Sequence, residues 1–154
     1  MKKLIALFVG VMSMGLTFGQ AGDLDERYLE LLLQGEKRTI INSGMALTTE
    51  EAPAFWALYD AYEAEFSTIS SKRMEMLNAY ADAFPNVSDE LANSLVTDMY
   101  KVNANVYKLR HKYAKKMAKE CSPQTAARFM QLDDLINTAI KLVWGSELPL
   151  IGDN

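Results

Sequence analysis

The stretch from Leu47 to Phe84 constrains the fold more than any other part of the chain, because its apolar and aromatic residues recur with a helical period. These residues fall three or four positions apart, interrupted once by the polar Arg73, at Phe55, Tyr59, Tyr62, Phe66, Ile69, Met76, Tyr80 and Phe84. Alternating threes and fours give the period of helices that pack nearly side by side. A helix of about 35 residues would be roughly 50 Å long, which predicts an elongated molecule.

A helix start signal precedes the aromatic seam. The hydroxyl of Thr48 can accept a hydrogen bond from the free backbone N–H three residues on, and the side chain of Glu51 can reach back towards the cap. This is the capping-box pattern. Leu47 stands just before the cap, where it can act as a hydrophobic staple. Pro53 is tolerated because it falls near the first turn, where few backbone donors have partners to lose. The sequence therefore predicts a long helix that is capped at Thr48 and Glu51.

Helix signals also occur on both sides of this central helix. A first helix is expected from Asp23 to about Ser43, ended by Asn42-Ser43-Gly44. Ser88 is the expected cap of a third long helix, whose apolar stripe contains Leu91, Leu95, Met99, Val102, Val106, Leu109, Tyr113 and Met117. No stretch shows the alternation of a strand. The predicted fold is all-α, an elongated antiparallel hairpin or bundle of about four helices that dimerises.

The fourth helix is expected to begin at Ser122, with Pro123 at the first helical position. Its apolar face contains Phe129, Leu132, Ile136, Ile140 and Val143. Gly145 is the expected stop. The apolar tail from Leu148 to Ile151 is expected to dock on the helices.

The first 21 residues have the pattern of a secretory signal peptide. A basic start is followed by an apolar run from Leu4 to Phe18 and by small residues at Gly19 and Ala21. Cleavage after Ala21 would leave one domain, residues 22–154. An uncleaved membrane anchor is the alternative, but the run is shorter than the roughly 20 residues that a span needs. The sequence predicts export to the periplasm, with no membrane span after cleavage.

The charge of the mature chain argues against nucleic-acid binding. Two of the 16 basic residues, Lys2 and Lys3, lie in the signal peptide, so the mature chain has 14 basic and 20 acidic residues and a net charge of −6. Cys121 is the only cysteine, which excludes an intrachain disulfide. In an oxidising compartment its thiol is either buried beside a helix start or available for an intermolecular bridge.

Antiparallel packing around Pro85 places residues about equally far from it opposite each other. Arg73 then faces Asp98, and we predict an ion pair that fixes the register of the two helices. Six basic residues crowd the end of the third helix, at Lys108, Arg110, Lys112, Lys115, Lys116 and Lys119. The acids expected opposite them are Glu50, Glu51, Asp60 and Glu63. Two interpretations stay open: intramolecular salt bridges, or a basic surface for an anionic client or a lipid headgroup.

The aromatic residues at the start of the central helix can also be interpreted in two ways. They are either part of the core or a binding surface, because Trp56 and Tyr59 cannot both point inward together with Phe55 and Tyr62. An exposed aromatic cluster beside a basic patch would suit a client or a dimer partner. The residues predicted for this surface are Trp56, Tyr59, Lys108, Lys112 and Lys115.

No pattern of catalytic chemistry is present. His111 is the only histidine, and it lies off the predicted seam. Met74 and Met76 are a weak signal for a soft metal, because Met76 fits the core stripe. The chain has no glycine-rich phosphate loop, nucleophile elbow or paired cysteine motif. We predict no catalytic residue, no metal site and no cofactor.

Two helix starts resemble the sequence motif of a known protein family. They are Leu47-Thr48-Thr49-Glu50-Glu51 and Cys121-Ser122-Pro123-Gln124-Thr125. Together with the signal peptide and the all-helical mature chain, they resemble the Leu-Thr-x-x-Gln (LTxxQ) starts of the Spy/CpxP-like periplasmic proteins. Glu51 stands where that motif has Gln, and Gln124 comes one place early. Short uncharacterised exported relatives of that family are similar in three further runs, Glu51–Tyr59, Ala127–Phe129 and Leu148–Leu150.

The resemblance implies a bent helical hairpin that dimerises into a cradle and acts as an ATP-independent chaperone or an envelope-stress accessory. Its partners would be unfolded proteins or an envelope sensor. Some relatives sense metals through His and Met, so the alternative function is a metal-responsive sensor or buffer, with the candidate ligands Met74, Met76, His111 and Cys121. We do not expect an enzyme.

Overall fold

The computed structural model describes residues 37–152, without the side chains at 139 and 142–147. Three long helices follow one another in this range: α3 (Ala52–Ala83), α4 (Asp89–Glu120) and α5 (Pro123–Glu147). A shorter helical segment covers residues 37–45. The described range contains no strand, so the all-α prediction is confirmed. The predicted signal peptide and the start of the first helix lie outside the described residues.

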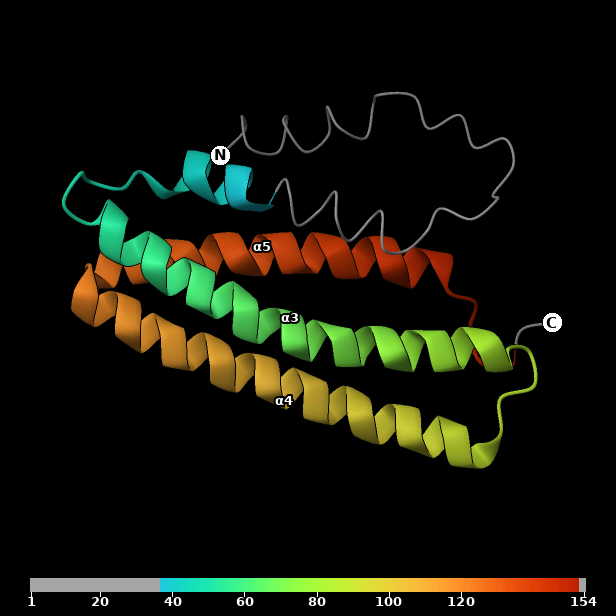
Figure 1. Ribbon diagram of the computed structural model, residues 1–154. Helices are drawn as coiled ribbons and strands as arrows, with labels where there is room; N and C mark the ends of the chain where they lie inside the picture. Colours follow the sequence, from blue (N-terminus) through green and yellow to red (C-terminus); the bar gives the residue numbers. More distant parts are fainter. Residues whose placement is uncertain (1–36, 153–154) are drawn as a thin grey trace, which may run out of the picture. The chain divides into compact units, whose positions relative to one another are not determined.

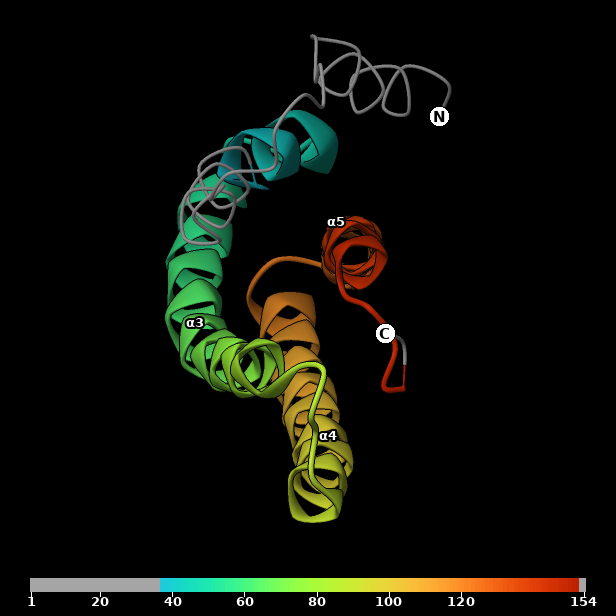
Figure 2. The ribbon, with the colours of Figure 1, turned by 90° about the vertical axis from the view of Figure 1, so that its right-hand side faces the viewer.

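The long helices pack antiparallel, as predicted. α3 contacts α4 and α4 contacts α5, and short connections join these pairs at opposite ends (Figure 1). Figure 2, which looks nearly along α5, shows that α4 leaves α5 towards its own N-terminal end. Dimerisation stays a prediction, because the structure contains one chain.

A capped turn precedes α3. Thr48 Oγ1 accepts a hydrogen bond from the backbone N–H of Glu51 at 3.2 Å, and the Thr48 carbonyl accepts one from Ala52 at 3.1 Å. Regular helix begins at Ala52, with Pro53 in the first turn. The predicted hydrogen bond to Thr48 is confirmed, but the N-cap position of α3 is Glu51, three residues later than predicted, and Glu51 forms no side-chain capping bond there.

Serine caps begin the other two long helices, as predicted. Ser88 Oγ accepts a hydrogen bond from the N–H of Leu91 at 3.2 Å. Ser122 Oγ accepts one from the N–H of Thr125, also at 3.2 Å, with Pro123 at the first helical position. Each cap satisfies a backbone donor that the helix leaves unpaired, and such a bond contributes about 1 kcal/mol.

Two predicted helix stops are wrong. The helical segment 37–45 continues through Gly44, where an added Cβ would lie 2.7 Å from Leu132 Cδ1 of α5. α5 continues through Gly145 and ends at Glu147. A glycine inside a helix costs only about 1 kcal/mol relative to alanine, so packing outweighs it. At Gly44 the missing side chain lets the segment approach α5 closely.

The tail after α5 docks through its first residues. Tyr80 Oη donates a hydrogen bond to the carbonyl oxygen of Pro149 at 2.6 Å, and Leu148 is half-buried. Leu150 and Ile151 are exposed. The predicted docking of the tail is therefore confirmed at Leu148 and Pro149.

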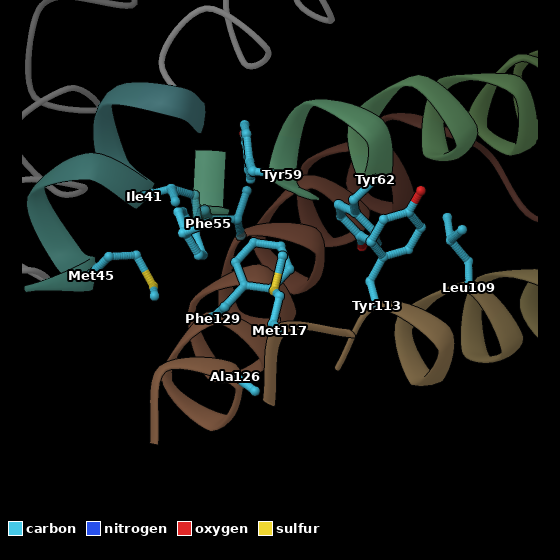
Figure 3. Close-up of a cluster of buried hydrophobic side chains, with 11 residues drawn as sticks. Ile41, Met45, Phe55, Tyr59, Tyr62, Leu109, Tyr113, Met117, Ala126 and Phe129 are labelled. Atoms are coloured by element: carbon cyan, nitrogen blue, oxygen red, sulfur yellow. The ribbon is translucent and has the colours of Figure 1, made fainter. Parts of the chain in front are cut away.

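The core lies where α3, α4, α5 and the segment 37–45 meet, as Figure 3 shows, and five of its eleven buried residues are aromatic. The ring of Phe129 on α5 lies edge-on to Phe55, Tyr59 and Tyr62 on α3, with ring centroids 5.7, 5.9 and 5.3 Å apart. Tyr113 on α4 lies edge-on to Tyr62 at 5.5 Å. Such pairs contribute about 0.5–1.5 kcal/mol each beyond the area that they bury. The aromatic seam of α3 thus faces the core, as predicted.

The apolar stripe of α4 is buried mainly in the second half of the helix. The buried members are Val102, Leu109, Tyr113 and Met117. Leu91 and Leu95 are only half-buried, and Met99 is 46% exposed. The stripe loses its cover towards the N-terminal end of α4, where the helix leaves α5.

The predicted ion pair between Arg73 and Asp98 is wrong. Arg73 Nη2 donates to Asn103 Oδ1 at 2.9 Å, and Asp98 pairs with Lys101 at 3.0 Å on its own helix. A register counted from the loop treats side chains as perpendicular to their helix, whereas they lean towards its N-terminus. In an antiparallel pair this lean carries Arg73 towards the C-terminal end of α4. It therefore meets a residue more than one turn beyond Asp98.

Candidate functional site

One face of α4 combines exposed aromatic residues with lysines. Three large apolar side chains are more than half exposed, at Val96 (53%), Tyr100 (68%) and Tyr107 (71%). They lie four and seven residues apart, so they share one side of the helix. Exposed lysines flank this stripe at intervals of seven residues, at Lys101, Lys108 and Lys115. These six residues are called the tyrosine–lysine face below.

The tyrosines of the tyrosine–lysine face escaped sequence prediction, whereas its Lys108 and Lys115 were predicted; the sequence nevertheless contains a signal for the tyrosines. The dipeptide Tyr-Lys occurs at residue 100 and again at residue 107. A repeat of seven residues returns to the same side of a helix. The apolar stripe of the core has the same period and masks the repeat on the opposite side.

Of the predicted binding lysines, two are available and one is occupied. Lys108 and Lys115 are exposed and form no ion pair within the described part of the chain. Lys112 Nζ lies 2.6 Å from Glu65 Oε1 of α3. Tyr113 Oη donates to the same oxygen at 2.8 Å. The hydrogen bonds from Lys112 and Tyr113 lower the pKa of Glu65.

The aromatic half of the predicted surface is not exposed as expected. Tyr59 is only 3% exposed, and burial raises its pKa. Trp56 is half-buried, and the guanidinium of Arg38 lies 4.4 Å from the centre of its ring. The prediction is wrong for Tyr59, because the segment that carries Arg38 packs over this side of α3.

The acids expected opposite the lysines mostly bind other partners. Asp60 pairs with Arg38, and Glu63 pairs with Lys37 at 2.8 Å, so both acids face the helical segment 37–45. The intramolecular interpretation is thus correct for Arg110 and Lys112, with partners other than those predicted, and it does not hold for Lys108 and Lys115. The predicted partners came from the same loop-based register that misplaced Asp98.

A buried cluster of charges ties α3, α4, α5 and the segment 37–45 together. Asp133 is fully buried, and Tyr62 Oη donates to its Oδ2 at 2.8 Å. Arg110 Nε lies 3.2 Å from Oδ2, and Lys37 Nζ lies 3.1 Å from Oδ1 in Coulombic contact. Lys37 also donates to Glu63 at 2.8 Å. We call this the Asp133 cluster. Its members come from four segments of the chain, so sequence spacing gave no sign of it.

Burial sets the electrostatics of the Asp133 cluster. Burial and the negative charge of Asp133 raise the pKa of Tyr62, so its hydroxyl stays protonated and donates. Burial raises the pKa of Glu63, and Lys37 offsets only part of this effect. Burial lowers the pKa of Arg110, but its acidic partners on α5 outweigh burial and the net pKa is raised. All these groups are engaged with one another, which indicates a structural tie.

The two helix starts that resemble the family motif meet in the structure. Thr125 Oγ1 donates a hydrogen bond to Glu51 Oε1 at 2.9 Å, and Ser122 Oγ donates to Thr125 Oγ1 at 2.9 Å. Interactions with Ser122 and Thr125 lower the pKa of Glu51, and the backbone N–H of Thr48 adds to the effect. Glu51 therefore joins the start of α3 to the start of α5.

Cys121 lies beside this junction. Its side chain is half-buried, with Sγ 3.9 Å from the carbonyl oxygen of Glu51. Burial raises the pKa of the thiol, and the negative charges of Glu51 and Glu120 raise it further. A thiol with a raised pKa is a weak nucleophile at neutral pH. This environment supports the buried interpretation of Cys121.

The residues considered for metal binding are spread over the described helices. Met74 and Met76 belong to α3, His111 is exposed on α4, and Cys121 follows α4. Within residues 37–152, no three His, Cys, Asp or Glu side chains converge as a metal site would require.

Comparisons of the chain with protein-family models, with curated proteins and with solved structures found no match. Among the described residues, no helix has the length and apolar character needed to cross a membrane.

Proposed function

We propose that the mature protein is a periplasmic Spy/CpxP-like helical binding protein, acting as an ATP-independent chaperone or an envelope-stress accessory. It binds unfolded proteins or a partner such as an envelope sensor, and it does not catalyse a reaction. The tyrosine–lysine face of α4 carries this proposal. The signal-peptide pattern of residues 1–21 supports the periplasmic location.

The chemistry of the tyrosine–lysine face suits partners of varied sequence. Tyr100 and Tyr107 offer flat apolar rings with a polar edge, which can cover many kinds of side chain. Lys108 and Lys115 attract acidic segments and have no intramolecular ion pair in the described residues. Neither kind of contact depends on one particular partner sequence.

The packing of α4 against the rest of the protein holds the face in place before a partner binds. The second half of α4, which contains Tyr107, Lys108 and Lys115, is held by the core and, through Arg110, by the Asp133 cluster. A preorganised face loses little conformational entropy when it binds, so even modest contacts contribute to affinity.

The test is suppression of aggregation of a chemically denatured model protein by the purified mature domain. We expect protection at a several-fold molar excess without ATP. The double variant Tyr100→Ser/Tyr107→Ser should lose most of it, because the apolar part of the face is removed while the core stays intact. Leu135→Ser is the matched control, since Leu135 is 56% exposed on α5.

Absence of protection by the folded wild type would remove the chaperone form of the proposal. Equal protection by the double variant would show that α4 is not the binding face. Recovery of one dedicated protein from periplasmic extract by the wild type, and not by the double variant, would favour the envelope-stress accessory.

A further inference from the structure

A groove lies between the C-terminal half of α3 and the N-terminal half of α4, with Lys141 of α5 and Leu148 of the following tail also lining it. Figure 1 shows these parts of α3 and α4 side by side. The volume of the groove is about 390 Å³. The apolar lining consists of Met76, Leu77, Tyr80, Leu95, Val96, Met99, Val102 and Leu148. This volume falls in the range of small-molecule sites, and the lining is of the usual apolar kind.

The polar groups at this groove are cations. Arg73 and Lys141 line it, and none of the lining residues whose side chains the structure describes is acidic. The guanidinium of Arg73 is half-buried, and its one hydrogen-bond partner within the described chain is the neutral amide of Asn103. A half-buried guanidinium usually faces a carboxylate or a phosphate, because desolvation of the charge is costly without one. Burial lowers the pKa of Arg73 in agreement with this.

We propose that this groove binds a medium-chain fatty acid, with the acyl chain along the apolar lining and the carboxylate on Arg73. The distance along α3 from Arg73 to Tyr80 is about 10 Å, at 1.5 Å per residue. This distance suits a chain such as that of decanoate. Lys141 gives the carboxylate a second cation at the groove. Of the tyrosine–lysine face, only Val96 lines this groove, so the proposal does not depend on client binding by the tyrosines and lysines of that face.

Methionine methyl groups provide a local readout in the intact mature protein. With methionine labelled by ¹³C at the methyl group, decanoate should shift the NMR signals of Met76 and Met99, which line the groove. The signals of Met45 and Met117 should stay in place, because both side chains are buried in the core. Shifts confined to the core, or no shift of Met76 and Met99 at millimolar decanoate, would overturn the proposal.

The role of the Arg73 charge in binding the carboxylate is tested with Arg73→Gln and with 1-decanol, the uncharged analogue of decanoate. Arg73→Gln should weaken decanoate binding about tenfold or more, the contribution of a hydrogen bond between charged groups, and should leave the weaker binding of decanol unchanged. Lys72→Gln is the matched control, because Lys72 is the exposed neighbouring cation outside the groove. Equal affinity of decanoate for the wild type and a folded Arg73→Gln variant would contradict a carboxylate site.

Circular dichroism checks that Arg73→Gln is folded. If it is not, Lys141→Gln carries the test, because Lys141 is exposed and its replacement leaves the packing unchanged. We then expect about a threefold loss of decanoate affinity, since an exposed cation is screened by water. An unchanged affinity in that variant would count against the proposal.

Discussion

The carboxylate of Asp133 is fully buried, and a lysine, an arginine and a tyrosine hydroxyl surround it. Removal of one member of a buried ion cluster is damaging, because the others keep their desolvation penalty and lose their partner. The exposed Asp134 also binds Arg110, at 2.7 Å, but its carboxylate is mostly in water. The two adjacent acids therefore have very different expected effects.

Replacement of Asp133 with Ala should lower the free energy of unfolding by about 3 kcal/mol. Tyr62 and Arg110 would lose a buried acceptor, and Lys37 would keep only Glu63. Replacement of Asp134 with Ala should cost less than about 1 kcal/mol, as for other exposed pairs. Urea denaturation followed by circular dichroism measures both values. Similar losses in the two variants would contradict a structural role for the buried carboxylate.

Glu63 should make the protein less stable as the pH rises through the acidic range. Its pKa is raised in the folded state by burial, so the folded protein binds this proton more tightly than the unfolded chain does. Its contribution is therefore fully present below the unfolded pKa of about 4.3 and is lost as the pH rises through the folded pKa.

Glu63→Gln should remove this dependence. The stability of the variant relative to the wild type should increase from pH 4 to pH 7, because the wild type alone must ionise a buried carboxyl group. Denaturation curves at a series of pH values measure the difference. A relative stability of the variant that falls over this range would show that Lys37 more than compensates for burial.

Cys121 should react slowly with thiol reagents. Only the thiolate attacks, and the pKa of this thiol is raised by burial and by two neighbouring acids. At pH 7.5 we expect the reaction with Ellman's reagent to be several-fold slower than that of free cysteine. The rate should keep rising above pH 9, and unfolding in urea should abolish the difference. A folded protein that reacts as fast as free cysteine would contradict this environment.

The cap at Ser122 stabilises more than the end of one helix, because α5 also positions Phe129 and Asp133 in the core. Ser122→Ala should lower the free energy of unfolding by about 1 kcal/mol or slightly more, since the N–H of Thr125 loses its acceptor. Ser71→Ala is the matched control, in an exposed position inside α3. Its effect should be neutral or slightly stabilising, since alanine has the higher helix propensity. A loss in the control equal to that in Ser122→Ala would argue against capping.

The side-chain contacts between α3 and α4 differ from those that a residue count from the loop at Pro85 predicts. Glu65 contacts Lys112 and Tyr113, and Arg73 contacts Asn103. All three contacts fall further towards the C-terminal end of α4 than a count from the loop at Pro85 places them. The lean of side chains towards the N-terminus of each helix explains the common direction of the shift.

Two copies of the whole molecule can neutralise charge by packing their α4 helices antiparallel. The first turn of α4 contains Asp89 and Glu90, and its second half contains most of its lysines. Antiparallel contact along the tyrosine–lysine face would bring the acidic end of one copy near the basic end of the other. The seven-residue spacing of Tyr100 and Tyr107 suits contact with a second helix. On this basis the predicted homodimer is expected to use the tyrosine–lysine face, so a client competes with the second copy for it.

We expect the wild type to sediment as a dimer at micromolar concentration. The double variant Tyr100→Lys/Tyr107→Lys should sediment as a monomer, because it places charges in the contact. Leu135→Lys should remain dimeric. A wild type that is monomeric at 100 μM, or a double variant that remains dimeric, would contradict this interface.

The sequence by itself determined the features that depend on neighbours within a turn or two of helix. These features are the period of the α3 seam, the hydrogen bond to Thr48, the caps at Ser88 and Ser122, and the all-α class, because backbone donors and apolar faces follow local spacing. At Gly44 and Gly145 this kind of prediction fails, because the preference of glycine for a helix end is weak and packing overrides it.

Only the tertiary structure decided which side chains meet. Asp133, Tyr62, Arg110 and Lys37 are far apart in the chain, and each by itself is compatible with an exposed position. The failed pair of Arg73 with Asp98 and the burial of Tyr59 have the same origin. These contacts depend on the register between helices, on the lean of the side chains and on the segment 37–45 that covers α3. All three are set by the three-dimensional packing rather than by local spacing.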